Sequence, residues 1–353
     1  MDRIARLRRE MKRRDLDNFL VTRLSNIRYL CGFSGSAGTL LITPRKARFF
    51  SDFRYKEQAA QQVRNADVII YPDELLKELR RRPLNLQGRL GFEAAFLDVA
   101  AYNSLREVLP GPEWVPTTKV VEQIASVKEP EEIEKIRKAA AITDEVFAEI
   151  LKLIKPGVRE LDISAEISYL HKKKGADGDS FTPIVASGPR SALPHGLASD
   201  KKIKSGELVT VDLGCFYQGY ASDLTRTVAV GSANGKMKTI YYLVLKAQTE
   251  AIAAARAGLK ARELDEVARK IIRDGGHGEH FGHGLGHGLG LEVHAEPRVS
   301  FLFEDVLKPG QVVTIEPGIY IPDMGGVRIE DDVLITDGSA EVITQSPRDL
   351  IVL

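Results

Sequence analysis

An internal duplication constrains the fold of this chain more than any other feature of its sequence. In each copy a helical pattern precedes a Val/Thr/Ile-rich run in which an acid stands six residues after a glycine. The two runs are SGELVTVDLG at 205–214, with Asp212, and PGQVVTIEPG at 309–318, with Glu316. Self-similarity on this scale is typical of a repeated supersecondary unit. We therefore predict two α/β halves related by a pseudo-two-fold axis.

Each predicted half supplies a second acid beyond its run, after a turn-like segment. Acids inside apolar runs are costly when they are ionised and unpaired, and like charges that face each other destabilise a sheet. Two such pairs at matched positions predict bound cations, rather than exposed hairpin acids paired with Lys or Arg. The expected facing pairs are Asp212 with Asp223, about a turn at 217–218, and Glu316 with Glu330, about a turn at 323.

A stretch rich in glycine and histidine, FGHGLGHGLGLEVHAEP at 281–297, is a candidate source of further ligands. Five of the seven histidines lie between His277 and His294. Glycine costs about 1 kcal/mol in a helix interior, so the alternating glycines predict a loop or strand edge with closely packed backbone. Taken alone, the stretch is equally consistent with a metal or catalytic site and with a glycine-rich loop that carries incidental histidines.

The ligand types indicate the class of metal. Four carboxylates carry the charge that two divalent ions neutralise. Oxygen ligands with one imidazole suit Mn²⁺, Co²⁺, Fe²⁺ or Zn²⁺ better than a thiolate-dominated site, and neither Cys31 nor Cys215 has metal-ligand spacing. Arg226 and Arg328 stand close to the acids in sequence, and we expect them to pair with neighbouring acids rather than to replace the ions.

The length of 353 residues exceeds that of a typical single core and predicts two domains. Residues 1–125 alternate strand and helix patterns without a site-like cluster of His, Cys or carboxylates, which indicates an accessory α/β domain. A helix that starts near Pro130 opens the second domain, 126–353. The strands expected in the first domain are 17–22, 39–43, 47–52, 67–71 and 89–92.

Composition limits the classes of binding partner and the cellular locations that we expect for this protein. With 43% hydrophobic residues, 28% charged residues and a net charge of +1, the chain gives no reason to expect nucleic acid or an acidic membrane as partner. It contains no apolar run of about 18 residues that would span a bilayer. The charged N-terminus carries an apolar stripe and predicts an amphipathic helix rather than a signal peptide. Two distant cysteines favour a reduced, cytoplasmic protein.

The second domain resembles the Xaa-Pro peptidases, prolidase and aminopeptidase P, which share the pita-bread fold with methionine aminopeptidase. The family signature Gly-His-x-hydrophobic-Gly-hydrophobic-x-Val-His matches GHGLGLEVH at 286–294. Farther upstream, SNIRYLCGFSGSAGTLLIT and SDFRY are similar to the creatinase-type domain of the same family. The resemblance implies an α/β (α+β) chain with a creatinase-like N-terminal domain and a pita-bread domain of pseudo-two-fold duplicated halves.

The resemblance also implies a dinuclear metal site and roles for individual residues. Glu316 is the implied general base, and His195 and His294 are the implied hydrogen-bond donors to the substrate carbonyl. The implied cofactor is two divalent ions, Mn²⁺ or Co²⁺ before Zn²⁺ or Fe²⁺. The metal ligands carried over in chain order are Asp212, Asp223, His287, Glu316 and Glu330.

One departure from the family pattern is Ala295, which replaces the acid that normally follows the second histidine. Position 295 is not a ligand position, so the metal site is expected to be intact, and the departure affects the support of His294. We also expect His283, Arg328 and Tyr320 to lie beside the metal ligands. His277 and His280 are expected in a surface loop, and His171 at a solvated helix end.

The implied reaction is hydrolysis of the bond between an N-terminal residue and proline in a di- or oligopeptide. A dipeptidase and an aminopeptidase share this site, and the sequence leaves the two open. Methionine aminopeptidase-like specificity is less favoured, because those enzymes lack a creatinase-type domain. A non-enzymatic binding module on the same fold is disfavoured, because all five ligand positions are intact. A homodimer is a further expectation from the family.

Overall fold

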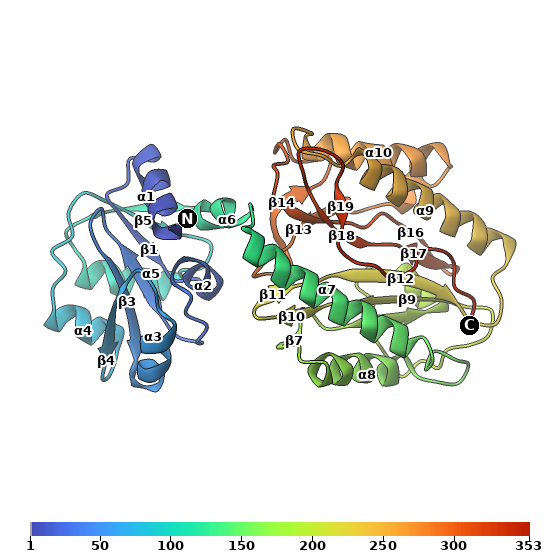
Figure 1. The fold of residues 1–353 in the computed structure, drawn as a ribbon, viewed down its shortest axis with the longest axis horizontal. Coiled ribbons are helices and arrows are strands. Elements are labelled where there is room, and N and C mark those ends of the chain that lie inside the picture. The colour runs from blue at the N-terminus through green and yellow to red at the C-terminus, as the bar shows by residue number, and fades with distance from the viewer. Residues whose placement is uncertain (1) are drawn as a thin grey trace. The chain divides into compact units, whose positions relative to one another are not determined.

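The computed structural model describes residues 2–353. By its internal contacts the chain divides into two compact units, of which the first ends at Ala125 and the second runs from Ser126 to Leu353 (Figure 1). Each unit is described by itself. None of the helices formed by residues 2–353 has the length and apolar character needed to span a bilayer.

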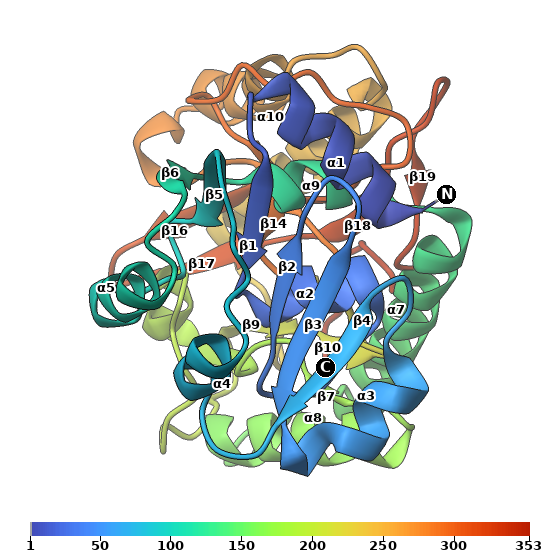
Figure 2. The same ribbon diagram turned by 90° about the vertical axis from the view of Figure 1, so that its left-hand side faces the viewer.

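The first unit is built on one six-stranded sheet with the order β4-β3-β2-β1-β5-β6, whose strands lie side by side in Figure 2. The five strands predicted in this region are confirmed to within one residue at each end. An edge strand, β6, was not predicted. The strands are β1 (Asn18–Val21), β2 (Thr39–Ile42), β3 (Ala47–Asp52), β4 (Asp67–Tyr71), β5 (Arg89–Glu93) and β6 (Glu113–Thr117).

Helices pack on this sheet through apolar stripes. The predicted N-terminal amphipathic helix is confirmed, because α1 buries Ile4, Leu7 and Met11. Leu79 of α4 and Leu105 of α5 join the apolar core with residues of the sheet. The helices are α1 (Arg3–Arg13), α2 (Leu24–Cys31), α3 (Lys56–Gln62), α4 (Leu75–Arg81), α5 (Val99–Val108) and α6 (Val120–Ala125), with the short helix η1 (Phe53–Tyr55).

The second unit opens with the predicted long helix. Pro130 occupies its first turn, where a missing N–H costs nothing, and Glu129 and Glu132 form a capping box. This helix and the next pack with the first group of strands in a common apolar core. The elements of the first half are α7 (Pro130–Ile150), α8 (Glu160–Lys173), β7 (Gly178–Asp179), β8 (Ile184–Ser187), η2 (Gly188–Ala192), β9 (Leu208–Leu213), β10 (Cys215–Tyr217), β11 (Tyr220–Ala221) and β12 (Leu224–Ala229).

The second half repeats the plan of two helices packed against strands, around its own apolar core. Within this unit the strands lie between the pair α7 and α8 on one side and the pair α9 and α10 on the other (Figure 1), which is the predicted pita-bread arrangement. Its elements are α9 (Gly235–Ala254), α10 (Ala261–Asp274), η3 (Gly278–His280), β13 (Gly286–Gly288), β14 (Ala295–Val299), β15 (Val312–Ile315), β16 (Gly318–Ile321), β17 (Gly325–Arg328), β18 (Asp331–Leu334) and β19 (Glu341–Val342).

The register predicted for the first hairpin is wrong by two residues. Asp212 pairs with Thr225, not with Asp223. The turn is formed by Gln218 and Gly219, whose φ angles of 47° and 79° are both positive. Two central residues with positive φ are what the favoured two-residue hairpin turn requires, and this requirement moves the turn one position beyond the predicted centre. As a result, Asp223 lies at the bend before β12.

The register predicted for the second hairpin agrees with the structure. β16 pairs with β17 and β15 with β18 in one common register, in which Gly318 faces Arg328 and Ile315 faces Asp331. Glu316 and Glu330 occupy opposed positions between these two ladders. The second half therefore presents its two acids as the sequence predicts.

The prediction for His171 is wrong, because its side chain is fully buried rather than solvated. His171 follows Ile163 and Ile167 at intervals of four, so it continues the buried stripe of α8. Its Nδ1 lies 2.7 Å from Asp179 Oδ1 on β7. The prediction of a solvated position came from the lysines that follow His171 in the sequence, whereas His171 lies on the buried face of the helix.

Candidate metal centre

All five side chains predicted as ligands line one cavity of about 450 Å³ in the second unit. Both halves contribute, because the strands that carry the acids meet at the centre of the unit. Four of the five residues are buried, and Glu316 is partly exposed. The ligands and their positions are Asp212 on β9, Asp223 before β12, His287 on β13, Glu316 after β15 and Glu330 before β18.

His287 presents one nitrogen to the acids. Its Nδ1 donates to the carbonyl oxygen of Gly288 at 3.1 Å, which leaves the lone pair of Nε2 free to bind a metal. Nε2 lies 3.3 Å from Glu316 Oε1 and 3.7 Å from Asp223 Oδ2. Burial lowers the pKa of His287 to about 3, so the ring is neutral at pH 7 and able to act as a ligand.

The acids repel one another in the absence of a cation. Burial, followed by the charge of Glu330, raises the pKa of Asp223 well above its usual range. Burial, followed by the charge of Glu316, does the same to the pKa of Glu330. Burial also raises the pKa of Glu316 to about 7. Without metal the cluster therefore retains protons at neutral pH, and a bound cation would displace them.

The residues present fit a divalent ion. Asp223, His287 and Glu330 each offer one ligand atom, and these atoms lie within 4.8 Å of one another. Two buried oxygens, Asp212 Oδ1 and Glu330 Oε1, have no hydrogen-bond partner within residues 2–353. A buried polar atom without a partner is costly, and a metal ion would supply the missing contact. Carboxylate oxygens with one imidazole are the donor set of Mn²⁺, Co²⁺, Fe²⁺ and Zn²⁺ sites.

Arg328 fixes the carboxylate of Asp212, an acid from the first half of the second unit. Its Nη2 donates to Asp212 Oδ2 at 2.6 Å, and its Nε donates to Thr225 Oγ1 at 3.0 Å. Thr225 Oγ1 in turn donates to Glu330 Oε2 at 2.6 Å. Each of these two acids thus keeps one oxygen fixed by the protein and one oxygen free. Arg328 also donates to the hydroxyl of Tyr320 at 3.0 Å, as expected for residues beside the ligands.

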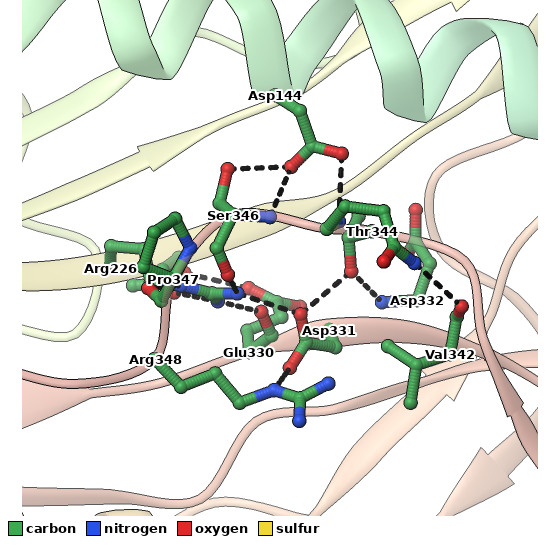
Figure 3. A network of polar contacts seen from close by, with 12 residues as sticks. Asp144, Arg226, Glu330, Asp331, Asp332, Val342, Thr344, Ser346, Pro347 and Arg348 are labelled. Atoms are coloured by element: carbon green, nitrogen blue, oxygen red, sulfur yellow. Dashed lines mark hydrogen bonds and ion pairs between the residues drawn. The ribbon is translucent and has the colours of Figure 1, made fainter.

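A buried network lies behind Glu330 (Figure 3). Arg226 is 1% exposed and donates to the carbonyl oxygen of Glu330 at 2.5 Å and to Asp331 Oδ1 at 2.8 Å. Asp331 also accepts from Thr344 Oγ1 at 2.7 Å and from Arg348 Nε at 2.6 Å. The expectation that Arg226 pairs with a neighbouring acid is confirmed, and the pair anchors the backbone of Glu330, a candidate ligand, to the C-terminal segment.

The remaining histidines divide into two groups. His195 and His294 line the cavity with exposed imidazoles, and the ring centroid of His294 lies 4.4 Å from that of His287. His277 and His280 do not line it; their Nδ1 atoms lie 3.4 Å apart around η3. The structure therefore places His195 and His294, the two histidines proposed to bind the carbonyl, in the cavity with the acids. His277 and His280 lie outside this cavity.

His283 lies beside the ligands, as expected, and makes two hydrogen bonds. Its Nδ1 donates to the carbonyl oxygen of Gly284 at 2.8 Å, so its Nε2 accepts from the hydroxyl of Tyr320 at 2.9 Å. Burial lowers the pKa of His283 to about 4. It remains neutral at pH 7 and orients Tyr320 toward the centre of the site.

The glycines of the histidine stretch allow strands to approach closely. A Cβ at Gly286 would lie 2.0 Å from the carbonyl oxygen of Thr314, and one at Gly288 would lie 2.1 Å from that of Glu296. Ala295, the departure from the family pattern, begins β14 and pairs with Gly288. It belongs to this packed strand pair and supplies no polar atom to the cavity.

Sequence reasoning missed several residues that complete the site. Thr225 and Thr314 donate to Glu330 and Glu316, and their only signal is their place in the acid-bearing runs. Arg298 also lines the cavity. It lies four residues after His294 and directly faces His287 across the β13–β14 pair, a position that strand pairing from the histidine signature could have indicated.

Comparisons with known proteins agree with this geometry. The model of metallopeptidase family M24 matches residues 134–337, and that of the creatinase/prolidase N-terminal domain matches residues 3–127. An Xaa-Pro dipeptidase of Pyrococcus furiosus is 39% identical over 353 residues, which cover 99% of each chain. The chain therefore belongs to metallopeptidase family M24, and the predicted family and fold are confirmed.

Two solved structures are similar over the whole chain. An Xaa-Pro dipeptidase from Bacillus anthracis superposes with a TM-score of 0.97 at 44% identity and covers 100% of this chain and 99% of that one. The prolidase from Pyrococcus horikoshii OT3 gives a TM-score of 0.95 at 40% identity, with coverage of 99% and 100%. Membership of this family implies divalent metal ions, for which the cluster of Asp223, His287 and Glu330 is the candidate site.

Proposed function

We propose that this chain is a dinuclear-metal peptidase that hydrolyses dipeptides of the form Xaa-Pro. The observation that carries the proposal is one cavity lined by all five candidate metal ligands and by the cationic side chain of Arg298. The names of the similar proteins, Xaa-Pro dipeptidase and prolidase, support the same reading. Residues 126–353 form the catalytic domain in this proposal, and residues 1–125 form an accessory domain.

Two divalent ions would be held by the carboxylates of both halves. The residues that would hold them are Asp212, Asp223, His287, Glu316 and Glu330. The donor set supports Mn²⁺ or Co²⁺, with Zn²⁺ or Fe²⁺ as alternatives. Ions bound here supply Lewis acidity, which lowers the pKa of water and polarises the peptide carbonyl.

The remaining chemistry belongs to the chain's own side chains. Glu316 accepts the proton of the attacking water, because its carboxylate lines the cavity beside the metal-facing nitrogen of His287. His195 and His294 donate hydrogen bonds to the carbonyl oxygen as negative charge develops on it. Proline forms a tertiary amide without an N–H, so recognition of its ring depends on shape, for which Phe181 and Phe303 give the cavity apolar surface.

Arg298 supports a dipeptidase over an aminopeptidase that takes longer chains. Its backbone pairs with that of His287 across the two strands, and its guanidinium makes no ion pair or hydrogen bond within the described part of the chain. After desolvation, its charge is the largest factor that lowers the pKa of His294. A guanidinium binds a carboxylate through two parallel hydrogen bonds. In an Xaa-Pro dipeptide the free carboxylate belongs to the proline residue, directly after the cleaved bond, and Arg298 lines the cavity that would hold it.

Arg298→Gln tests this assignment. The variant is expected to raise KM for Ala-Pro by about 10- to 100-fold, since a hydrogen bond to a charged group contributes about 1.5–3 kcal/mol. The amidated substrate Ala-Pro-NH₂ lacks the carboxylate and serves as the internal control, with KM nearly unchanged by the substitution. Equal losses for both substrates, or efficient cleavage of Ala-Pro-Ala by the wild-type enzyme, would favour an aminopeptidase instead.

Two other functions lack support. A non-enzymatic binding module would need no complete ligand set, yet all five side chains converge here. Methionine aminopeptidase-like specificity is disfavoured by the match of residues 3–127 to the creatinase/prolidase N-terminal domain. The homodimer expected from the sequence stays a prediction.

A further inference from the structure

Glu160 is a buried acid outside the metal cavity. It is the first residue of α8, and its side chain has no exposed surface. Its Oε1 accepts from the backbone N–H and the hydroxyl of Ser187, both at 2.8 Å. Its Oε2 accepts from Arg190 Nε at 3.0 Å, Ser199 N at 3.1 Å and Ser199 Oγ at 2.7 Å. One carboxylate therefore receives five hydrogen bonds.

These donors belong to one loop, 187–199, which we call the His195 loop. Ser187 ends β8, and Ser199 closes the loop on its far side. Between them, Arg190 Nη2 donates to the carbonyl oxygen of Leu197 at 2.6 Å, so Arg190 ties the middle of the loop to Glu160. Each oxygen of Glu160 thus holds one end of the loop.

The His195 loop reaches the metal cavity through its tip. The carbonyl oxygen of Pro194 accepts from Arg328 Nη1 at 3.2 Å, and the same guanidinium holds Asp212. The imidazole of His195 lines the cavity, is exposed, and makes no hydrogen bond within residues 2–353. The placement of this ring therefore depends on the backbone of the loop.

The geometry of its partners requires both oxygens of Glu160 to accept hydrogen bonds. Each of its oxygens accepts from a backbone N–H, Ser187 N on one and Ser199 N on the other. A backbone N–H cannot reverse its role, whereas a hydroxyl can rotate to accept. Glutamine at position 160 would turn its own NH₂ group toward one of these two N–H groups. It would therefore release one end of the loop while keeping the size of the side chain.

We propose that Glu160 is a positioning residue that acts through His195. It sets both ends of the His195 loop so that the imidazole faces the substrate carbonyl, and none of the five candidate ligands lies on this loop. This inference rests on the proposed peptidase function. The loop keeps a separate anchor, in which Gly326 N donates to Ser191 Oγ at 2.8 Å, so loss of the Glu160 contacts displaces the loop without detaching it.

A double-mutant cycle with Glu160→Gln and His195→Ala tests the proposal on the full-length, Mn²⁺-loaded protein. For the single variant Glu160→Gln we expect kcat for Ala-Pro to fall by about 10- to 100-fold, because a misplacement of about 1 Å costs up to this much. In the His195→Ala background the same substitution should change kcat less than about twofold, since the two residues act as one unit. Equal losses in both backgrounds would overturn the proposal.

Mn²⁺ affinity separates positioning from general damage. Titration of the metal-free variant, followed by the EPR signal of free Mn²⁺, is expected to give wild-type affinity, and a tenfold weaker affinity would contradict the proposal.

Glu166→Gln, the same change on the same helix at a partly exposed position, is the matched control and should leave kcat unchanged. If Glu160→Gln does not fold, Ser199→Ala removes one hydroxyl contact and should lower kcat in the same direction, again only while His195 is present. Wild-type protein that binds Mn²⁺ and cleaves no Ala-Pro would refute the proposed function itself.

Discussion

Replacing Glu316 by glutamine is expected to lower kcat for Ala-Pro hydrolysis by about 10²–10⁴-fold, the range typical of a lost general base. Glu316 lines the cavity, and its Oε1 lies 3.3 Å from the metal-facing nitrogen of His287. Its Oε1 also accepts from Thr314 Oγ1 at 3.1 Å, which fixes the carboxylate. An amide can neither accept the proton nor neutralise the charge of a divalent ion, so both roles are lost together.

Steady-state kinetics at saturating Mn²⁺ measures this effect, with bound metal determined on the same samples. Glu279→Gln is the matched control, because Glu279 is exposed on η3 and should leave kcat unchanged. Near-wild-type turnover by Glu316→Gln would refute its assignment as the base. A variant that binds the wild-type amount of metal and still loses activity would separate the role of the base from that of the ligand.

Divalent metal is expected to stabilise the protein strongly, and more so at higher pH. In the metal-free protein Glu316 has a pKa of about 7, above its ordinary value of 4.5. Its contribution to folding stability is therefore complete below pH 4.5 and is lost as the pH rises through about 7. Asp223 and Glu330, whose pKa values burial and neighbouring acids also raise, change stability in the same direction.

Thermal unfolding from pH 5 to pH 8, with Mn²⁺ or with a chelator, measures this difference. Metal binding requires the ionised acids, so we expect the gain in Tm from Mn²⁺ to increase across this range. At a metal concentration of about 100 times Kd the gain should be on the order of 5–10 °C. Asp223→Asn should remove most of the gain. A gain that is absent, or that shrinks as the pH rises, would contradict the cluster of buried, repelling acids.

The meeting of the five candidate ligands in one cavity could be predicted from sequence because each residue lies inside a local pattern. Four stand at matched places in the duplicated runs, and His287 lies in the histidine signature. The residues that fix them come from distant segments, so no local pattern reports them. Thr225, for example, contacts Glu330 from 105 residues away. Likewise, the partners of Glu160 could not be found without the fold that closes the His195 loop.

The errors in the fold have local physical causes. β6 was missed because its sequence, EWVPT, contains a proline, which a strand at the edge of a sheet tolerates. The first hairpin was misaligned because positive φ at Gln218 and Gly219 decides the turn, whereas the turn predicted at 217–218 lies one residue early. His171 was misplaced because the lysines beside it suggested a solvated helix end, whereas its spacing from Ile167 predicts burial.

One measurement tests the central proposal most directly: titration of the metal-free protein with Mn²⁺, with hydrolysis of Ala-Pro and Ala-Ala followed at each point. We predict that Ala-Pro hydrolysis appears as up to two ions bind per chain, and that Ala-Ala is cleaved far more slowly. Two bound ions without Ala-Pro cleavage, or equal cleavage of both dipeptides, would contradict an Xaa-Pro peptidase built on this metal centre.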